Sequence, residues 1–505
     1  MSKAAEAQLT PQPAAIEPLE FPDRVKALIA AAAAESLVVV VVAAFAVTLV
    51  VRLSAQVNQD AWLAFLNGRS ILDHGLPHRD LFTIWGSGPW VDQQWLSQLA
   101  LYGLYAAGGI ALVAFAHALL TAGAVAAAVA AARRRASAQH TLLPLPFVFW
   151  VLAGSTWQAR TQSFAYPLFV AVLLLLVADS RRPSRRVYLT IPLLALWANL
   201  HGSVVLGVGL VCLRALLRLI DARRVSRSPR VLLPGLSLFL LAPAMLFASP
   251  YGLSLAGYYH HTLLNPAFAM VNEWQPPAFN PLTAPFFVLA IGTAWLLGRA
   301  RSALTAYERL ALLLTLLAAF TATRNLGWFA LTATVLVPAA LDEALPKKRV
   351  DGRRSGELFN TAFAAVSVVA LLFVLTVTLF RPARWFTAAY PKGGAEAVAR
   401  AAAADPSATV FADVKYGDWL LFVHPSLAGR VAYDARFELL PTRRISQIYN
   451  INVEDGGSWP AATRGFRLVV LDRANESHAI AGLRRAGARV LYDAKGMVVL
   501  ERPPA

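Results

Sequence analysis

The sequence predicts a mainly α-helical, polytopic membrane protein that ends in a C-terminal α/β domain. Of its 505 residues, 57% are hydrophobic and only 15% are charged, against about a quarter in an ordinary soluble domain. A bilayer span takes about 20 apolar residues. Long runs with almost no charge cover 37–51, 110–132, 167–178, 231–248, 310–321 and 361–380. This composition argues against a soluble globular enzyme.

Basic residues gather between the apolar runs. The net charge is +17, which in a soluble chain would suggest a nucleic-acid partner. Five short clusters stand out: Arg133 to Arg135; Arg181, Arg182, Arg185 and Arg186; the arginines from Arg214 to Arg230; Arg299, Arg301 and Arg309; and Lys347, Lys348, Arg349, Arg353 and Arg354. Such clusters mark cytoplasmic loops. We therefore expect a multi-pass protein of the plasma membrane with no nucleic-acid partner.

The basic clusters define the predicted topology, because a segment between two cytoplasmic loops crosses the membrane an even number of times. Residues 1–26 are expected to form a cytoplasmic tail, followed by a membrane domain over 27–380. A first span near 28–52 leads to a large outer loop, 53–94, which is too polar to span. Residues 95–132 are expected to return as one helix with a break near Gly108–Gly109.

The later apolar runs form four outward and inward pairs: 141–156 with 162–179, 187–199 with 202–220, 231–249 with 284–298, and 310–321 with 328–341. A second large outer loop covers 250–283, and a last span near 358–380 leads out. The total is about 11 spans, with a range of about 9–13, because several runs are shorter than about 20 residues. An odd number of spans places the two termini on opposite sides of the membrane. Because the basic clusters are assigned to the cytoplasm, the N-terminus is expected there and the C-terminal domain outside.

Residues 381–505 have the alternating pattern of an extracytoplasmic α/β domain. Strands are expected over 409–412, 430–433, 467–471, 488–492 and 497–500, with helices near 394–404, 416–422 and 476–486. No P-loop, GxGxxG or GxSxG motif occurs in this segment. The single cysteine of the chain, Cys212, excludes an internal disulfide and a cysteine-based metal site.

Carboxylates of the first outer loop are the candidate catalytic groups. Ionisable groups beside a membrane core are costly unless they serve a site or find a partner. Asp60 lies a few residues past the first span and is the candidate general base for an acceptor hydroxyl. The alternative is an N-cap of a helix that begins at Ala61. Asp80, in an extended or turning segment, is expected either to orient the acceptor or a metal ion, or simply to cap a turn.

Arginines facing outward are the candidate groups for binding the phosphate of a donor. A guanidinium makes bidentate contacts with phosphate and stays charged in a low dielectric, which points to Arg160, Arg324 and Arg69. The alternatives are snorkelling to the interface or pairing with a loop carboxylate. His201, at another outer turn, is either a site residue or a hydrogen-bonded histidine at a helix break.

Glu273, Trp274 and Trp90 are the candidates for binding the acceptor or a sugar. Glu273 and Trp274 lie in the second large outer loop and offer a further acidic group and a ring able to stack on a sugar. Trp90 suits the same role, and an interfacial aromatic belt equally well. No metal site follows from the residue spacing and no cofactor is required, although a divalent cation such as Mg2+ or Mn2+ between Asp60 and a pyrophosphate stays open.

Short polar and aromatic clusters run along most of the chain. The first outer loop contains Asp60-Ala61-Trp62, Asn67-Gly68-Arg69, His74-Gly75, Asp80-Leu81-Phe82-Thr83, Pro89-Trp90-Val91 and Trp95-Leu96. Later pieces are Arg160-Thr161-Gln162, Trp197 to Gly202, Pro250-Tyr251-Gly252, Glu273-Trp274, Arg324-Asn325, Tyr416 to Leu420 and Tyr433 to Glu438. Together they resemble the bacterial multispanning glycosyltransferases of the GT-C superfamily, in the style of family 39 and of mannosyltransferases that use dolichyl-phosphate-mannose.

The resemblance implies a GT-C-like membrane domain, a catalytic aspartate in the first outer loop, here Asp60, and a polyprenyl-phosphate-linked sugar as donor. Two positions depart from the pattern. Members often carry a second acidic residue beside the first aspartate, where this chain has Asn58 and Gln59, and the position before Trp95 is often Glu but is Gln94 here. Metal use and the identity of a second acid therefore stay open.

Three classes of function compete at this point. The leading one is sugar transfer from a polyprenyl-phosphate donor to a glycan, lipid or protein acceptor at the outer membrane face. A lipid or solute transporter would carry charges deep within its spans, and many transporters also contain inverted repeats. A non-catalytic assembly or docking protein of the cell envelope would use its outer domain, where Asp418, Asp434, Arg436 and Glu438 form the most prominent charged cluster.

Overall fold

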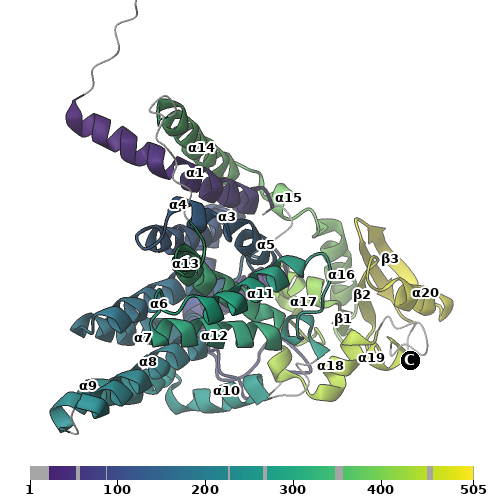
Figure 1. Ribbon diagram of the computed structural model, residues 1–505. Helices are drawn as coiled ribbons and strands as arrows, with labels where there is room; N and C mark the ends of the chain where they lie inside the picture. Colours follow the sequence, from purple (N-terminus) through teal and green to yellow (C-terminus); the bar gives the residue numbers. More distant parts are fainter. Residues whose placement is uncertain are drawn as a thin grey trace, which may run out of the picture.

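A bundle of long helices lies beside a small sheet in the computed structural model of the chain (Figure 1), which describes residues 22–52, 57–86, 88–225, 228–264, 270–346, 357–451 and 459–503. The helices up to residue 346 are α1 (Asp23–Arg52), α2 (Gln59–His74), α3 (Trp95–Arg133), α4 (Ala138–Leu142), α5 (Leu145–Ser155), α6 (Ala165–Arg181), α7 (Thr190–Ala198), α8 (Val204–Val225), α9 (Pro229–Ala244), α10 (Leu255–Leu264), α11 (Ala284–Arg299), α12 (Ala306–Thr321) and α13 (Leu326–Ala344). Those that follow are α14 (Glu357–Leu379), α15 (Ala383–Phe386), α16 (Lys392–Ala404), α17 (Val414–Val423), α18 (Thr442–Tyr449), α19 (Trp459–Ala462) and α20 (Ser477–Arg485).

Short 3-10 helices occur at many of the turns. They are η2 (Thr161–Phe164), η3 (Arg185–Leu189), η4 (Met245–Phe247), η5 (Gly252–Ser254), η7 (Asn272–Trp274), η8 (Thr323–Asn325), η10 (Pro425–Leu427) and η11 (Phe437–Leu439). Three of them, η2, η7 and η8, lie next to candidate site residues. Tight 3-10 turns commonly connect longer helices, and here they carry side chains of the candidate site.

Five helical stretches of the described chain are long and apolar enough to cross a membrane: Trp95–Arg133, Thr161–Arg181, Pro229–Phe247, Thr323–Ala344 and Phe359–Leu379. They support a multi-pass membrane protein. Other predicted spans are shorter apolar helices, such as Glu35–Val50 and Ala284–Arg299, and the run 187–199 contains the end of η3 and the nine residues of α7. The count of about 11 spans, the orientation and the domain boundaries stay predictions.

The long helix α3 is broken where the sequence predicts it. Gly108 and Gly109 have non-helical backbone angles, with φ at +65° for Gly109. Only glycine adopts such a positive φ without steric cost. The break divides the helix into an N-terminal part beside α2 and a longer apolar part that ends at Arg133.

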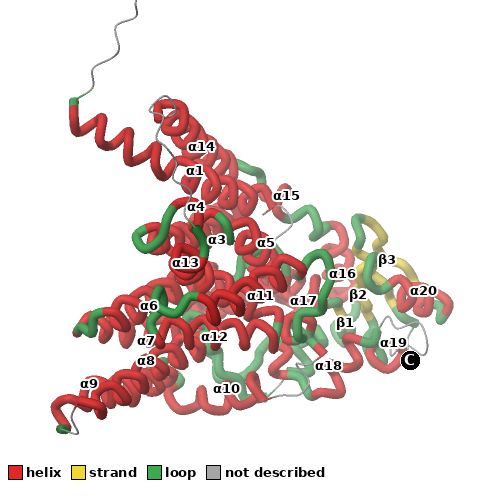
Figure 2. Tube along the Cα trace, viewed as in Figure 1, coloured by secondary structure: helices red, strands yellow, loops and turns green. Residues whose placement is uncertain are grey.

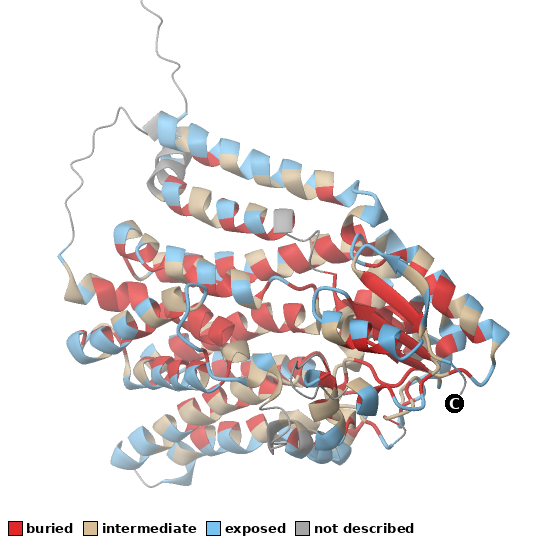
Figure 3. Ribbon diagram, turned by 90° about the vertical axis from the view of Figure 1, so that its right-hand side faces the viewer, coloured by how far each residue is buried: buried red, intermediate tan, exposed pale blue. Residues whose placement is uncertain are grey.

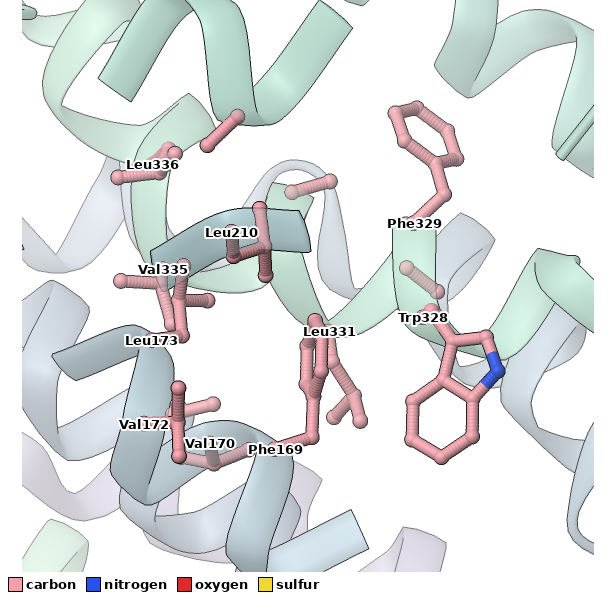
Figure 4. Packing of buried hydrophobic residues seen from close by; sticks show 14 of the residues in the cluster. Phe169, Val170, Val172, Leu173, Leu210, Trp328, Phe329, Leu331, Val335 and Leu336 are labelled. Carbon is pink, nitrogen blue, oxygen red and sulfur yellow. The ribbon is translucent and has the colours of Figure 1, made fainter. Parts of the chain in front are cut away.

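Helix α13 forms the centre of the bundle. Every residue from Leu326 to Leu341 is buried, as expected for a helix that is apolar on all sides. Figure 4 shows Trp328, Leu331 and Val335 facing Phe169 and Leu173 of α6. The ring centroids of Phe169 and Trp328 are 5.2 Å apart, so close side-chain packing positions η8, which immediately precedes α13.

Helices α1 and α14 pair with each other at the edge of the bundle (Figure 1). Helix α14 is mostly exposed, with Phe359, Phe363 and Phe373 as exposed apolar side chains, whereas Phe45 and Leu49 of α1 are buried. Large exposed apolar surfaces of this kind are expected where a helix faces lipid.

The sheet has four strands in the order β1-β2-β4-β3 (yellow in Figure 2). Strand β1 (Val410–Ala412) pairs in parallel with β2 (Leu468–Asp472), whereas β4 (Met497–Glu501) is antiparallel to both β2 and β3 (Arg489–Ala494). Strands β1 and β2 are buried throughout (red in Figure 3), as expected for strands covered on both faces.

The predicted strand over 430–433 makes only isolated bridges. Val431 bridges Val410 on one side and Thr83 of the first outer loop on the other, both in parallel. Backbone hydrogen bonds from Ile84 to Val431 and from Trp85 to Ala432, each 2.9 Å, extend this contact. The first outer loop is therefore fastened to the edge of the C-terminal sheet.

Helix α2, which carries Asp60, is held between α3 and α17. A Cβ atom at Gly68 would lie 2.4 Å from the carbonyl oxygen of Gln98, so only glycine allows α2 and α3 to approach this closely. On the other side, the rings of Trp62 and Phe422 are 5.6 Å apart. This packing sets the position of the first turn of α2.

Candidate functional site

A polar cavity of about 320 Å³ opens at the N-terminal end of α2. Its wall combines segments that are far apart in the sequence: the first turn of α2, the loop leading into α3, the turns around η2, η7 and η8, and residues 435–438. The polar and aromatic side chains of the wall include Asp60, Trp90, Asp92, Gln93, Gln94, Gln98, Arg160, Gln162, His201, Tyr258, Glu273, Trp274, Arg324, Arg436 and Glu438. We call this space the central cavity.

Asp60 lies in the first turn of α2 and does not cap it. The helix begins at Gln59, and its N-cap residue is Asn58, whose side chain makes no capping hydrogen bond. A carboxylate in the first turn is favoured by the helix dipole. The Asp60 side chain is 33% exposed, so its oxygens remain accessible from the cavity.

Arg160 joins Asp60 to Glu273. Its Nη1 donates to Glu273 Oε1 at 2.8 Å and to Asp60 Oδ2 at 3.3 Å. The Arg160 side chain is only 15% exposed, and ion pairs with little exposure are screened less than surface pairs. Three charged side chains from α2, the turn before η2, and η7 therefore form one unit on the cavity wall.

The pKa values of the two carboxylates in this unit are shifted in opposite directions. Burial raises the pKa of Asp60 above its usual value, although Arg160 opposes the shift. Burial also acts to raise the pKa of Glu273, but the charge of Arg160 and its hydrogen bond outweigh it and lower the pKa. A raised pKa makes a carboxylate a better proton acceptor. The site therefore shifts Asp60 toward a better proton acceptor and Glu273 toward a more stable carboxylate.

Arg324 presents a guanidinium to the cavity. Its Cζ lies 4.2 Å from the centroid of the Trp274 ring, a cation–π contact that orients the planar group. The turn is tied to η7 because Thr323 donates from its backbone nitrogen to Gln275 O at 2.9 Å. In the described part of the chain Arg324 has no salt bridge. This positive charge is thus available to an anion.

His201 lies on the same wall and is held by its neighbour. Its Nδ1 is 2.7 Å from Ser203 Oγ and accepts from the Ser203 backbone nitrogen at 3.1 Å. Burial lowers the pKa of His201 well below its usual value, and the charges of Arg324 and Arg160 lower it further. The imidazole is therefore neutral at physiological pH.

A second cavity of about 390 Å³ shares seven wall residues with the central cavity: Gln94, Gln162, His201, Tyr258, Thr262, Trp274 and Arg324. Beyond these shared residues its wall is mainly apolar and includes Val205, Leu206, Leu314, Ala318 and Trp328. These residues come from α8, α12 and α13, the helices of the bundle. We call it the apolar cavity. A cationic group thus lies at its junction with the polar space.

The C-terminal segment closes another part of the central cavity through Arg436. The guanidinium is 3% exposed and pairs with Asp80 at 2.5 Å and with Asp434. Its Cζ also lies 4.4 Å from the centroid of the Trp90 ring. Arg436 therefore connects the first outer loop to the C-terminal segment at the cavity wall.

Two further carboxyl groups of the wall have perturbed acidity. Burial raises the pKa of Asp92 to about 7, against the lowering effect of Arg436. Burial likewise raises the pKa of Glu438 to about 7. Nearby, Gln93 Oε1 and Gln98 Oε1 are buried without a hydrogen-bond partner among the described residues. These atoms offer acceptors to hydroxyl groups of a ligand.

A third cavity of about 500 Å³ joins the central one at Trp90, Val91, Tyr258, Thr262 and Glu438. The other residues of its wall include His78, Pro89, Pro250, Tyr251, Ser254 and Leu439. The ring of His78 contacts Tyr251 edge-on at 5.7 Å. We call this the aromatic cavity. The central cavity thus has two different neighbours, one mainly apolar and one aromatic.

Seven predicted site residues line the central cavity: Asp60, Arg160, Arg324, His201, Glu273, Trp274 and Trp90. Asp80 and Arg69 do not. Asp80 accepts hydrogen bonds from the backbone nitrogens of Phe82 and Thr83 and pairs with Arg436, so it caps a turn and anchors a residue of the wall. Arg69 donates to Phe422 O at 3.0 Å and stacks on that ring, and it holds α2 against α17.

No group of three or more His, Cys, Asp or Glu side chains that could hold a metal ion is found within the described residues. At the position considered for a divalent cation, Asp60 and Glu273 instead share the guanidinium of Arg160. This arrangement supplies positive charge beside both carboxylates.

Several wall residues carry no strong signal in the sequence. Examples are the uncharged residues Gln93, Gln98 and Tyr258. They lie in segments whose sequence fits a loop or the membrane interface equally well. One usable signal is the spacing of Gln94 and Gln98, which are four residues apart at the start of α3 and so share a helix face.

Searches of protein-family models and of curated proteins each found no match to this chain. Among solved structures, the chain is similar to ArnT from Cupriavidus metallidurans bound to undecaprenyl phosphate, with 13% identity, a TM-score of 0.48, and coverage of 94% of this chain and 100% of that one. The apo state of the same protein gives 14% identity, a TM-score of 0.48, and coverage of 95% and 100%. The oligosaccharyltransferase of Archaeoglobus fulgidus in the apo form gives 13% identity, a TM-score of 0.44, and coverage of 87% and 70%.

Proposed function

We propose that this protein is a membrane glycosyltransferase of the GT-C type. It moves a sugar from a polyprenyl-phosphate-linked donor to an acceptor at the outer face of the plasma membrane. The observation that carries the proposal is the central cavity, where the carboxylate of Asp60, whose pKa is raised, and the guanidinium of Arg324 face one space. The resemblance of the polar clusters in the sequence to multispanning glycosyltransferases supports the same conclusion.

The junction with the apolar cavity supports a lipid-linked donor. A polyprenyl chain needs an apolar channel between helices, and its phosphate needs positive charge at the mouth of that channel. Arg324 lies at this junction beside the neutral His201. The proposed donor therefore places its phosphate near Arg324 and its lipid chain among α8, α12 and α13.

Asp60 acts in the proposed reaction as general base. It takes the proton from the acceptor hydroxyl, whose oxygen attacks the anomeric carbon as the bond from that carbon to the phosphate oxygen breaks. The bond electrons leave with the polyprenyl phosphate, whose charge Arg324 stabilises. Arg160 and Glu273 fix the position of Asp60, and the reaction inverts the anomeric configuration.

The aromatic cavity supports entry of the acceptor from a second direction. Its shared wall contains Trp90, Tyr258 and Glu438. Aromatic rings next to hydrogen-bonding groups suit a polar ligand with hydroxyl groups. Donor and acceptor would then meet at Asp60 without competing for one entrance, and alignment of the two reactants supplies much of the rate acceleration.

The test compares purified wild type, Asp60→Asn and Asp73→Asn in nanodiscs, with radiolabelled sugar on polyprenyl-phosphate donors. Asp73 is an exposed carboxylate on the same helix and does not line the cavity, so it is the matched control. We expect transfer by wild type and Asp73→Asn and none by Asp60→Asn. Full transfer by well-folded Asp60→Asn would refute the assignment of the base. No turnover by wild type with any donor would favour the docking or transport class.

A further inference from the structure

A basic pocket lies at the far end of α8 from the central cavity. Helix α8 begins three residues after His201 and runs 22 residues to Val225, which spans about 33 Å. The pocket has a volume of about 250 Å³ and is lined by Arg214, Arg218 and Asp221 of α8 and by Val231, Pro234 and Gly235 of α9, among others. It belongs to none of the three cavities of the candidate site.

The pocket is built on tightly packed helices. A Cβ atom at Gly235 would lie 2.8 Å from Leu219 Cγ and 3.2 Å from the carbonyl oxygen of Ala215, so α8 and α9 are in close contact. Tyr188 of η3 adds a hydrogen bond of 2.7 Å between its hydroxyl and Ser237 Oγ of α9. The walls of the pocket are therefore held in place by the fold.

The positive charge around this pocket comes from arginines beyond its wall, because Arg214 and Arg218 are balanced by Asp179 and by Asp221, which also pairs with Arg224 at 3.8 Å. The buried carboxylate of Asp179 accepts from Arg214 Nε at 2.8 Å and from Arg218 Nη1 at 3.2 Å, so two guanidinium groups share one carboxylate. Within the described residues, the Nε and Nη2 atoms of Arg218 have no acceptor. Further exposed arginines on the same packed elements are Arg182, Arg185, Arg186, Arg223, Arg224 and Arg230.

An apolar surface continues from the pocket along α9. Leu233, Leu236 and Leu240 are 61%, 45% and 61% exposed, and the stretch Pro229–Phe247 is long and apolar enough to cross a membrane. A ligand with an anionic head and hydrocarbon chains matches both surfaces together. A free phosphate ion would use only the arginines.

We infer that this pocket binds the headgroup of an acidic phospholipid, with the phosphate at Arg218 and the acyl chains along α9. Arginine contacts phosphate bidentately, and basic pockets between membrane helices on the cytoplasmic side suit anionic headgroups. The basic clusters predict this end of the bundle to be cytoplasmic. The inference is independent of the proposed transferase activity, because the pocket lies outside the candidate site.

The test is native mass spectrometry of the full chain with equimolar phosphatidylglycerol and phosphatidylcholine. We expect wild type to retain phosphatidylglycerol preferentially. Arg218→Gln should weaken this binding about tenfold, as for loss of one charge-assisted hydrogen bond. Val231→Glu is a second variant, for use if Arg218→Gln does not fold. It leaves the ion pairs of Asp179 intact and places a carboxylate at the pocket, so it should also weaken phosphatidylglycerol binding.

The matched control is the double variant Arg299→Gln with Arg301→Gln, which removes two exposed arginines that do not line the pocket. It should bind phosphatidylglycerol as wild type does. Three results would overturn the inference: equal retention of the two lipids by wild type, an equal loss in the control, or displacement of the lipid by equimolar inorganic phosphate.

Discussion

Arg160 lies closer to Glu273 than to Asp60, at 2.8 Å against 3.3 Å from the same Nη1 atom. The shorter contact stabilises the charge of Glu273, whose pKa is lowered. Asp60 receives the weaker contact and keeps a raised pKa because burial dominates there. One guanidinium thus contacts two carboxylates whose pKa values shift in opposite directions.

Replacement of Arg324 should reduce transfer strongly. Arg324→Gln removes the positive charge that faces the proposed leaving phosphate, and kcat/KM should fall about 100-fold or more, as for other groups that stabilise transition-state charge. Arg324→Lys should give an intermediate rate, because it keeps a charge but loses the planar stack on Trp274. Arg299→Gln is the control. Unchanged kcat/KM in folded Arg324→Gln would contradict the proposed role.

The pH dependence of kcat/KM should report the environment of Asp60. The base works when deprotonated, so the rate should fall as pH decreases through the raised pKa of Asp60. The charge of Glu273 is one cause that raises this pKa, so Glu273→Gln should lower it and move the acidic limb to lower pH. The control is Glu396→Gln, because Glu396 forms an exposed ion pair with Arg400 away from the cavity. This variant should leave the pH profile unchanged. A shift toward higher pH in Glu273→Gln would disprove the coupling.

Gly68→Ala should destabilise the protein. The added methyl group meets Gln98 O at 2.4 Å and Tyr102 Cβ at 2.6 Å, and overpacking of this kind costs about 1–3 kcal/mol. The control is Gly103→Ala, because nothing lies within 4 Å of the added Cβ atom. Its melting temperature in detergent should equal that of the wild type or be slightly higher. Equal melting temperatures for the two variants would show that α2 can move away from α3.

The carboxyl group of Glu438 should make stability depend on pH. Its pKa is raised by burial from the usual 4.5 to about 7, so the folded protein favours the protonated form more than the unfolded chain does. Stability is then lost as pH rises from about 4.5 to 7. Glu438→Gln should raise the melting temperature at pH 8 but not at pH 4. An equal effect at both values would point to packing instead.

Chelation should leave sugar transfer unchanged. Asp60 and Glu273 already share the charge of Arg160, and no larger cluster of metal-binding side chains occurs among the described residues. Transfer assays with and without EDTA check this expectation. A loss that Mg2+ or Mn2+ restores would show that a cation takes part.

The sequence predicts site residues best where a residue type is costly in its position unless it has a functional role. Arginine, aspartate and histidine at turns between apolar runs are costly without a role, which singles out Asp60, Arg160 and Arg324, three residues of the central cavity wall. The break at Gly108–Gly109 was predictable because glycine allows a positive φ. The helical class likewise follows from the apolar composition.

The remaining features depend on contacts between distant segments. Asp80 and Arg69 look like site residues, but their partners are Arg436 and Phe422, more than 350 positions later. The segment 430–433 has the pattern of a strand, yet it lies between β1 and the first outer loop and forms only bridges. Neutral wall residues such as Gln93 and Tyr258 carry no charge that marks them as part of a site.

The ion pair between Arg436 and Asp80 has a consequence for biosynthesis. The ribosome adds Arg436 long after the helices of the bundle have been inserted, and one wall of the central cavity comes from residues 435–438. A nascent chain therefore passes through most of its synthesis with Asp60 and Arg160 in place but no complete cavity around them. The cavity is complete only when residues 435–438 have folded against the segment that carries Asp80.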